Sequence, residues 1–138
     1  MRIFVDTNLL VYLNTLITED IRMIYENFYL NLATEHRMYT DVLVLDELIY
    51  VSKKRYFVPY VITLSFIKSI VLPYVIVLPL GEDEYNEAAK FIEKYDVKPS
   101  NALHIGAMKM NNIDVIVSED KELDKIDEIK RMWIQTSK

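Results

Sequence analysis

The chain has 138 residues, of which 51% are hydrophobic and only two are Gly, a composition that suits one domain spanning 1–138 and excludes intrinsic disorder. It contains no cysteine, which excludes disulfides and thiolate metal sites and fits a cytoplasmic protein. Its net charge of −5 argues against a protein that coats nucleic acid through bulk charge, although a local basic patch remains open.

The pattern of apolar residues predicts an α/β protein. In chain order it predicts a strand at 2–5, helices at 8–15 and 18–34, a short strand near 38–39, helices at 41–56 and 59–72, a strand at 74–78, helices at 82–95 and 100–111, and strands at 114–117 and 131–134. Asp41, Ser100 and the Thr18-Glu19-Asp20 run are the expected helix starts. Apolar strands that alternate with helices predict a parallel sheet covered on both faces.

One apolar stretch, 58–80, has the hydropathy of a membrane span. Lys68 lies near its centre, and Pro59, Pro73 and Pro79 divide it into pieces shorter than the ~20 residues that a span requires. We therefore predict a helix followed by a buried strand in this stretch, and no membrane partner.

Two of the predicted strands end in acidic residues. The strand 2–5 leads to Asp6, and the strand 114–117 leads through Ser118 to Asp120. Ligands of open parallel sheets bind beyond the carboxyl ends of the strands, so both acids would project from one rim. Each acid also lies near a helix start, and capping alone is the alternative explanation for either. The two together favour a binding or catalytic site.

A third acid is expected from the helix 41–56. Glu47 stands in an apolar row with Val44 and Val51, where a carboxylate is costly unless it is paired or bound to a metal. Its neighbour Asp46 is nearly as well placed, and a surface Glu at the edge of the core is the alternative. The same helix ends in the basic run 53–55, which either complements the helix C-terminus or contacts phosphate.

Four segments together resemble a known family. They are FVDTN at 4–8, VLDELIY at 44–50, PSNALHIGAM at 99–108 and VIVSEDKEL at 115–123. Their order, spacing and strand–helix context resemble the PIN-domain family and, within it, the VapC-type toxin ribonucleases. The resemblance covers nearly the whole chain. It implies a three-layer α/β/α sandwich around a short, mostly parallel sheet, and metal-dependent endonucleolytic cleavage of RNA with Mg²⁺ or Mn²⁺.

The resemblance also implies which residues form the site. By position, the acidic metal ligands and catalytic residues of the family fall on Asp6, Glu47 and Asp120, with Thr7 and Asn8 as the usual followers of the first acid and Ser118 in a supporting hydroxyl position. It thereby selects Glu47 over Asp46. The candidate RNA-binding residues are Lys53, Lys54 and Arg55.

Asn101 is the clearest departure from the family pattern, which normally has Asp at this catalytic and metal-binding position. Asn keeps one carbonyl oxygen as a potential ligand, but it brings an NH₂ group in place of the second oxygen and removes one negative charge. We expect weaker metal binding as a result, most severely for a second ion. Histidine is common at the position of His104 in the family, and we expect it to pack beside the site rather than bind metal.

Three interpretations of Asn101 remain open at this point. An active ribonuclease would hold one metal ion on the three acids, with Asn101 contributing an oxygen or a water contact. A degenerate PIN domain would keep the fold and act as an RNA- or protein-binding module without cutting. Alternatively, Asn101 stands at a position where the natural residue is Asp.

The resemblance implies two protein partners, a small antitoxin and a second copy of the chain in a homodimer. The stretches 24–32 and 60–72 offer more apolar surface than a small core needs, although simple core packing explains them equally well.

Overall fold

The computed structural model describes residues 1–134. The sheet consists of β1 (Arg2–Val5), β2 (Arg37–Asp41), β3 (Val75–Leu78), β4 (Val115–Val117) and β5 (Lys130–Met132). All neighbouring strands pair in parallel, in the order β3-β2-β1-β4-β5. Because β1 is the central strand, Ile3, Phe4 and Val5 are fully buried, which explains the unbroken apolar run at the start of the sequence.

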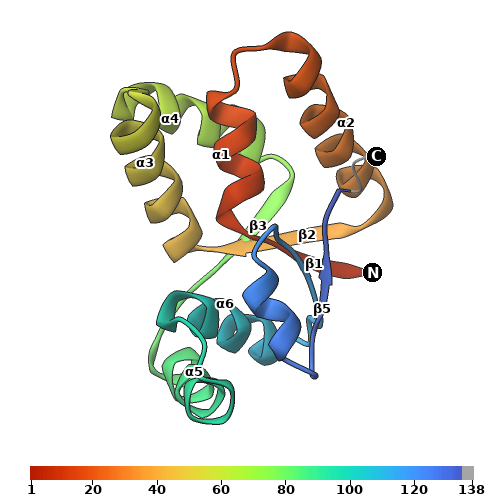
Figure 1. Cartoon of the computed structure of the whole chain (residues 1–138), viewed down its shortest axis with the longest axis vertical. Coiled ribbons are helices and arrows are strands. Elements are labelled where there is room, and N and C mark those ends of the chain that lie inside the picture. The colour runs from red at the N-terminus through yellow and green to blue at the C-terminus, as the bar shows by residue number, and fades with distance from the viewer. Residues whose placement is uncertain (135–138) are drawn as a thin grey trace.

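Helices cover both faces of this sheet. They are α1 (Thr7–Thr15), α2 (Glu19–Glu35), α3 (Val42–Tyr56), α4 (Tyr60–Phe66), α5 (Glu82–Tyr95) and α6 (Pro99–Met110), together with the π-helix η1 (Ile67–Val71) and the 3₁₀-helix η2 (Lys121–Lys125). Figure 1 shows α1 to α4 on one side of the sheet and α5 and α6 on the other. This three-layer α/β/α arrangement confirms the predicted fold class.

The strand β2 is longer than the sequence predicts and lies inside the sheet. Its residues include Thr40 and Asp41, which are polar and yet fully buried. The Thr40 hydroxyl donates a hydrogen bond to the carbonyl oxygen of Val5 at 2.8 Å, so its burial costs little. A strand with these polar residues lacks the apolar run that marks β1, and for this reason the prediction limited it to 38–39.

Two predicted element ends are also wrong. The helix α6 begins at Pro99 after Lys98, so Ser100 does not start it, because proline is favoured in the first helical turn. The strand β5 spans 130–132 rather than 131–134. The prediction for Asp41 is confirmed, because its carboxylate caps α3 by accepting a hydrogen bond from the Val44 amide at 3.0 Å.

The apolar stretch 58–80 forms α4, η1 and β3, which confirms the predicted helix and strand, but β3 lies at the edge of the sheet and its Ile76 is 49% exposed rather than buried. Among residues 1–134, no helix combines the length and the apolar character that crossing a membrane requires.

Gly106 allows α5 and α6 to pack closely. A Cβ atom at this position would collide with the carbonyl oxygen of Glu84 and lie 3.2 Å from the Ala88 nitrogen. Both are backbone atoms, which cannot move aside without shifting the helix. We expect Gly106→Ala to lower the free energy of unfolding by about 1–3 kcal/mol, measured by urea denaturation. The matched control is Gly81→Ala, where the added Cβ meets only the flexible Glu84 side chain and the expected loss is below about 1 kcal/mol. Equal losses in both variants would contradict this account of Gly106.

Candidate functional site

The first acid of the site, Asp6, follows directly from β1 and is 6% exposed. Its Oδ1 accepts a hydrogen bond from the Thr7 amide at 2.7 Å and caps α1, while its Oδ2 accepts one from the Ser118 hydroxyl at 2.6 Å. Ser118 follows β4, the neighbouring strand, so adjacent carboxyl ends of the sheet fix this carboxylate from two sides. Asp6 therefore caps α1 and also lies where the sequence predicts the site.

The second acid, Glu47, reaches the same place from α3. Its Oε1 accepts a hydrogen bond from the Thr7 hydroxyl at 3.1 Å and lies 3.3 Å from His104 Nε2. Asp46, the alternative that the sequence left open, is exposed and is not among the residues that line the cavity described below. The structure thus brings Glu47, and not Asp46, to the edge of the sheet where Asp6 lies.

His104 connects these two acids to a third, buried carboxylate. Its side chain is 1% exposed, and its Nδ1 lies 2.7 Å from Oδ2 of Asp41, which is itself fully buried at the end of β2. Its Nε2 faces Oε1 of Glu47 and lies 3.7 Å from Oδ1 of Asp6. His104 therefore packs beside the site, as the sequence predicts, and hydrogen-bonds Asp41, which the sequence did not predict as a partner.

The protonation of His104 follows from this arrangement. Burial alone would lower its pKa, but the hydrogen bonds to Asp41 and Glu47 and the nearby negative charges raise its pKa to about 10. Burial is the largest single influence on Glu47 and would raise its pKa, but the hydrogen bonds from His104 and Thr7 and the charges of His104 and Lys98 together outweigh it, so the pKa of Glu47 lies below its ordinary value. The protein thus holds a cation among three carboxylates at neutral pH.

On the other side of the site, Asn101 contacts two carboxylates through its nitrogen. Its Nδ2 donates a hydrogen bond to Asp120 Oδ2 at 3.1 Å and another to Glu122 Oε2 at 2.7 Å. The Lys98 ammonium lies 3.4 Å from the same oxygen of Asp120. Burial favours a raised pKa for Asp120, but the hydrogen bond from Asn101 and the charge of Lys98 leave its pKa below the ordinary value.

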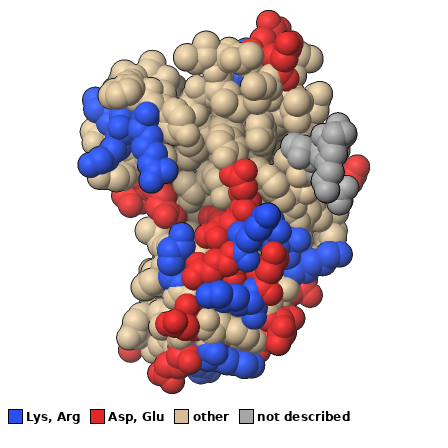
Figure 2. Space-filling model, in the orientation of Figure 1, with Lys and Arg blue, Asp and Glu red and all other residues tan. Residues whose placement is uncertain are grey.

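Most of these residues line one cavity of about 340 Å³, whereas Asp41, Ser118 and Glu122 are not among its lining residues. Of the predicted site residues, it is lined by Asp6, Thr7, Asn8, Glu47, Asn101, Asp120 and Arg55. Lys53 and Lys54 do not line it, because their ammonium groups lie over the rings of Tyr60 and Tyr50, at 5.3 and 5.7 Å from the ring centres. Figure 2 shows the basic side chains gathered over α3, beside a mixed acidic and basic area on the same face.

The chemistry of this cavity fits a hard divalent cation, which prefers carboxylate oxygens. Asp6 and Glu47 are the residues that would hold it, since both line the cavity and their oxygens lie close together, at 3.7 and 3.3 Å from one atom, Nε2 of His104. Asp120 is turned toward Asn101 and Lys98 instead. Within residues 1–134, no three His, Asp or Glu side chains are arranged so that they could together hold a metal ion.

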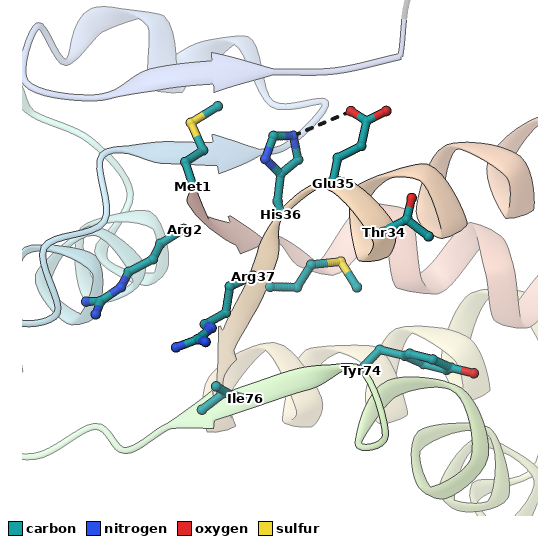
Figure 3. Close-up of a pocket in the computed structure, with 9 residues that line it drawn as sticks. Met1, Arg2, Thr34, Glu35, His36, Arg37, Tyr74 and Ile76 are labelled. Carbon is teal, nitrogen blue, oxygen red and sulfur yellow. Dashed lines mark ion pairs between the residues drawn. The ribbon is translucent and has the colours of Figure 1, made fainter.

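A larger hollow of about 540 Å³ lies at the opposite edge, at the amino ends of β1 and β2. Figure 3 shows its lining, in which the one carboxylate, Glu35, approaches His36 Nε2 at 4.0 Å. Ligands of parallel sheets bind at the carboxyl ends of the strands, so we assign the candidate site to the 340 Å³ cavity.

The sequence did not indicate Asp41, Lys98 or Glu122 as part of the site, nor Tyr12 and Glu119, which line the cavity and hydrogen-bond each other. Asp41 could have been predicted, because it lies at the carboxyl end of a strand, as Asp6 does. The prediction missed it because the strand was limited to 38–39. Lys98 and Glu122 had no such signal, since their backbone-to-carboxylate contact joins positions 24 residues apart in the chain.

Solved structures share this fold over nearly the whole chain. VapBC2 from Rickettsia felis, bound to a promoter DNA fragment, has a TM-score of 0.71 at 19% identity, covering 96% of this chain and 98% of that one. DNA-bound VapBC from Salmonella typhimurium has a TM-score of 0.71 at 21% identity, covering 96% and 98%. Mycobacterium tuberculosis VapC20, a sarcin–ricin loop cleaving toxin, has a TM-score of 0.70 at 16% identity, covering 88% and 92%.

These identities show a common fold and no more. No curated protein matches the sequence. The family model described as "PIN domain", however, matches residues 3–129, a range that contains all four segments on which the resemblance rests. The chain therefore belongs to the PIN-domain family.

Proposed function

We propose that this protein is a metal-dependent endoribonuclease and the toxin of a toxin–antitoxin pair. The observation that carries this proposal is the convergence of Asp6, Glu47 and Asp120 on one cavity at the carboxyl edge of a PIN-domain sheet. The structural neighbours include VapBC complexes and a toxin that cleaves the sarcin–ricin loop, which supports RNA as the substrate class.

In this proposal, Asp6 and Glu47 hold a Mg²⁺ or Mn²⁺ ion. When bound, the ion supplies a water of lowered pKa and screens the charge of the scissile phosphodiester. Ser118 and Thr7 orient the two carboxylates through their hydroxyl groups. The His104 imidazolium offsets part of the electrostatic repulsion between the two carboxylates.

The cations at the rim would attract the RNA backbone. Arg55 and Lys98 line the cavity, and we propose Lys53 and Lys54 as outer phosphate contacts on the same helix as Arg55. Such local contacts are needed because the net charge of −5 repels phosphate. The test is to replace all three residues of the run 53–55 by Gln and to measure RNA affinity. An unchanged affinity would show that these residues do not contact the RNA.

Ser118 is proposed as a positioning residue that joins two acids. It donates to Asp6 Oδ2 at 2.6 Å and accepts from the Asp120 amide at 3.1 Å. We expect Ser118→Ala to reduce metal affinity and cleavage by about 10–100-fold, because the Asp6 carboxylate loses the hydroxyl that orients it and the Asp120 backbone amide loses its acceptor. Ser118→Thr, which keeps the hydroxyl, should retain more of both; equal losses in the two variants would indicate a packing role instead.

We further propose an antitoxin partner and a homodimer. The VapBC neighbours support the antitoxin.

Exposed apolar side chains on α4 support a protein interface: Tyr60, Val61, Ile62 and Leu64 are 51–67% exposed. In the stretch 24–32, Tyr29 and Leu32 are buried, which favours core packing for part of that segment. Light scattering that showed only monomer at micromolar concentration would count against the homodimer.

The direct test of the nuclease is incubation of the purified protein with a structured RNA, with Mn²⁺ or with excess chelator. We expect cleavage with Mn²⁺ and none with chelator. No cleavage at millimolar Mn²⁺ would contradict the proposal.

A second candidate function is favoured by one observation. Asn101 presents its NH₂ group to Asp120, where the family pattern has a carboxylate. A protein with this change could bind RNA or a protein partner without cutting it. Stable binding of intact RNA in the same assay, together with cleavage by Asn101→Asp, would support this binding module.

A further inference from the structure

Lys98, Asn101, Asp120 and Glu122 form a closed cluster, here called the amide cluster, at the start of α6 and η2. Besides the two bonds from Asn101 Nδ2, the Lys98 amide donates to Glu122 Oε1 at 3.0 Å and the Glu122 amide donates to Asp120 Oδ1 at 3.0 Å. Every carboxylate oxygen of Asp120 and Glu122 therefore accepts at least one hydrogen bond from within the cluster. The two segments are joined by these contacts and not by apolar packing alone.

The orientation of the Asn101 amide is set by its neighbours. Its side chain is buried, and both protons of its NH₂ group have a carboxylate acceptor. In the reversed orientation the amide oxygen would face the same two carboxylate oxygens at 2.7 and 3.1 Å with no proton between them. Asn101 therefore acts as a donor to carboxylates and does not offer its oxygen toward Asp120.

The charge of the amide cluster is balanced in part by Lys98, whose ammonium lies 3.4 Å from Asp120 Oδ2. An Asp at position 101 would replace the bridging NH₂ group with a third carboxylate, and one ammonium would then face three negative charges. Carboxylates so placed repel one another unless a proton or a cation lies between them. Asn101 and Lys98 thus perform the charge compensation that a second cation would perform for an acidic cluster.

We propose that Asn101 and Lys98 replace a cation at this end of the cavity, so that the protein takes one divalent ion, at Asp6 and Glu47, and holds Asp120 and Glu122 in place independently of metal. The statement about Asp6 and Glu47 rests on the proposed function, whereas the statement about the amide cluster rests on its own hydrogen bonds. Asn101 is in this account a positioning residue for Asp120.

The test compares thermal unfolding and metal binding of the wild-type protein and Asn101→Asp, in chelator and in Mn²⁺. In chelator we expect Asn101→Asp to lower Tm by about 5–10 °C, since it removes two buried hydrogen bonds and adds a buried charge. Mn²⁺ should restore most of this loss. Calorimetric titration should give one Mn²⁺ per wild-type chain and two per Asn101→Asp chain. The matched control is Asn27→Asp, which adds the same charge at an exposed position of α2 and should show neither effect.

Lys98→Gln provides a second variant in case Asn101→Asp does not fold. It leaves the Asn101 bridge intact and removes the ammonium, so a second, weaker Mn²⁺ equivalent should appear. Two equivalents in the wild-type protein would overturn the proposal, as would an Asn101→Asp protein with unchanged Tm in chelator. None of these readouts involves cleavage, so a wild-type protein that binds one ion but leaves RNA intact would refute the nuclease and support the amide cluster.

Discussion

His104→Leu is expected to destabilise the folded protein by about 3–5 kcal/mol, measured by urea denaturation. The reason is that Asp41 is fully buried and its Oδ2 has the His104 ring as its ionic partner at 2.7 Å. Removing the imidazolium leaves this carboxylate charged and unpaired in the interior. Glu47 and Asp6 lose the same cation, although Glu47 is partly exposed and water can compensate it.

The chain offers a matched control for this substitution, because it contains only two histidines. His36 lies at the end of α2, and within residues 1–134 its one ionic neighbour is the exposed Glu35 at 4.0 Å. We expect His36→Leu to change stability by less than about 1 kcal/mol. Adding Asp41→Asn to His104→Leu should recover part of the loss, since the unpaired group is then neutral. A His104→Leu protein as stable as the His36→Leu protein would contradict the ion-pair account.

The same contact has a defined pH dependence. The pKa of His104 is about 10 in the folded protein, above its ordinary value of 6.5, so protonation favours folding. Its contribution is fully present below pH 6.5 and is lost as pH rises through about 10. The difference in unfolding free energy between the wild-type and His104→Leu proteins should therefore shrink from pH 6.5 toward pH 10, and a constant difference would indicate lost packing alone.

Asp6→Asn is expected to have the largest effect on activity, a loss of RNA cleavage of at least about 100-fold. The substitution removes one of the two charges proposed to hold the metal ion, which is worth several kcal/mol in the transition state. The fold should be retained, because an Asn at this position can still accept from the Thr7 amide at the start of α1. The measurement is single-turnover cleavage in Mn²⁺, with circular dichroism to verify folding.

Asp20→Asn is the control for this prediction, since Asp20 is an exposed acid in the first turn of α2, outside the cavity. It removes the same charge from the chain and should leave cleavage unchanged. A folded Asp6→Asn protein that cleaves as fast as Asp20→Asn would show that Asp6 does not take part in the reaction.

The sheet was predictable where burial and hydrophobicity coincide. The strand β1 is central and its last three residues are fully buried, so an unbroken apolar run was enough to find it. The strand β2 is equally internal, yet it buries Thr40 and Asp41 by hydrogen bonding them to Val5, Val44 and His104. Val5 and His104 are distant from these residues in sequence, which is why pattern and propensity missed most of this strand.

The sequence predicted where the acids of the candidate site lie, but not which hydrogen bonds their side chains make. Asp6 and Asp120 could be placed because the carboxyl ends of parallel strands meet at one edge. The resemblance then added Glu47. What Asn101 does there depended on which atom of its amide faces Asp120 and Glu122, and on Lys98 reaching the same carboxylate. No sequence pattern encodes the orientation of a side-chain amide, so the choice between a metal ligand and a bridge required coordinates.

We propose that the acids at this edge of the sheet bind the divalent ion used for cleavage. Calorimetric titration of Mn²⁺ into the wild-type, Glu47→Gln and Asp46→Asn proteins tests it most directly, because the two acids are adjacent in α3 but only Glu47 lines the cavity. We expect the wild-type and Asp46→Asn proteins to bind Mn²⁺ alike, and Glu47→Gln to bind at least about 10-fold more weakly. Equal binding by Glu47→Gln and the wild-type protein, or no binding by the wild-type protein at millimolar Mn²⁺, would contradict the account.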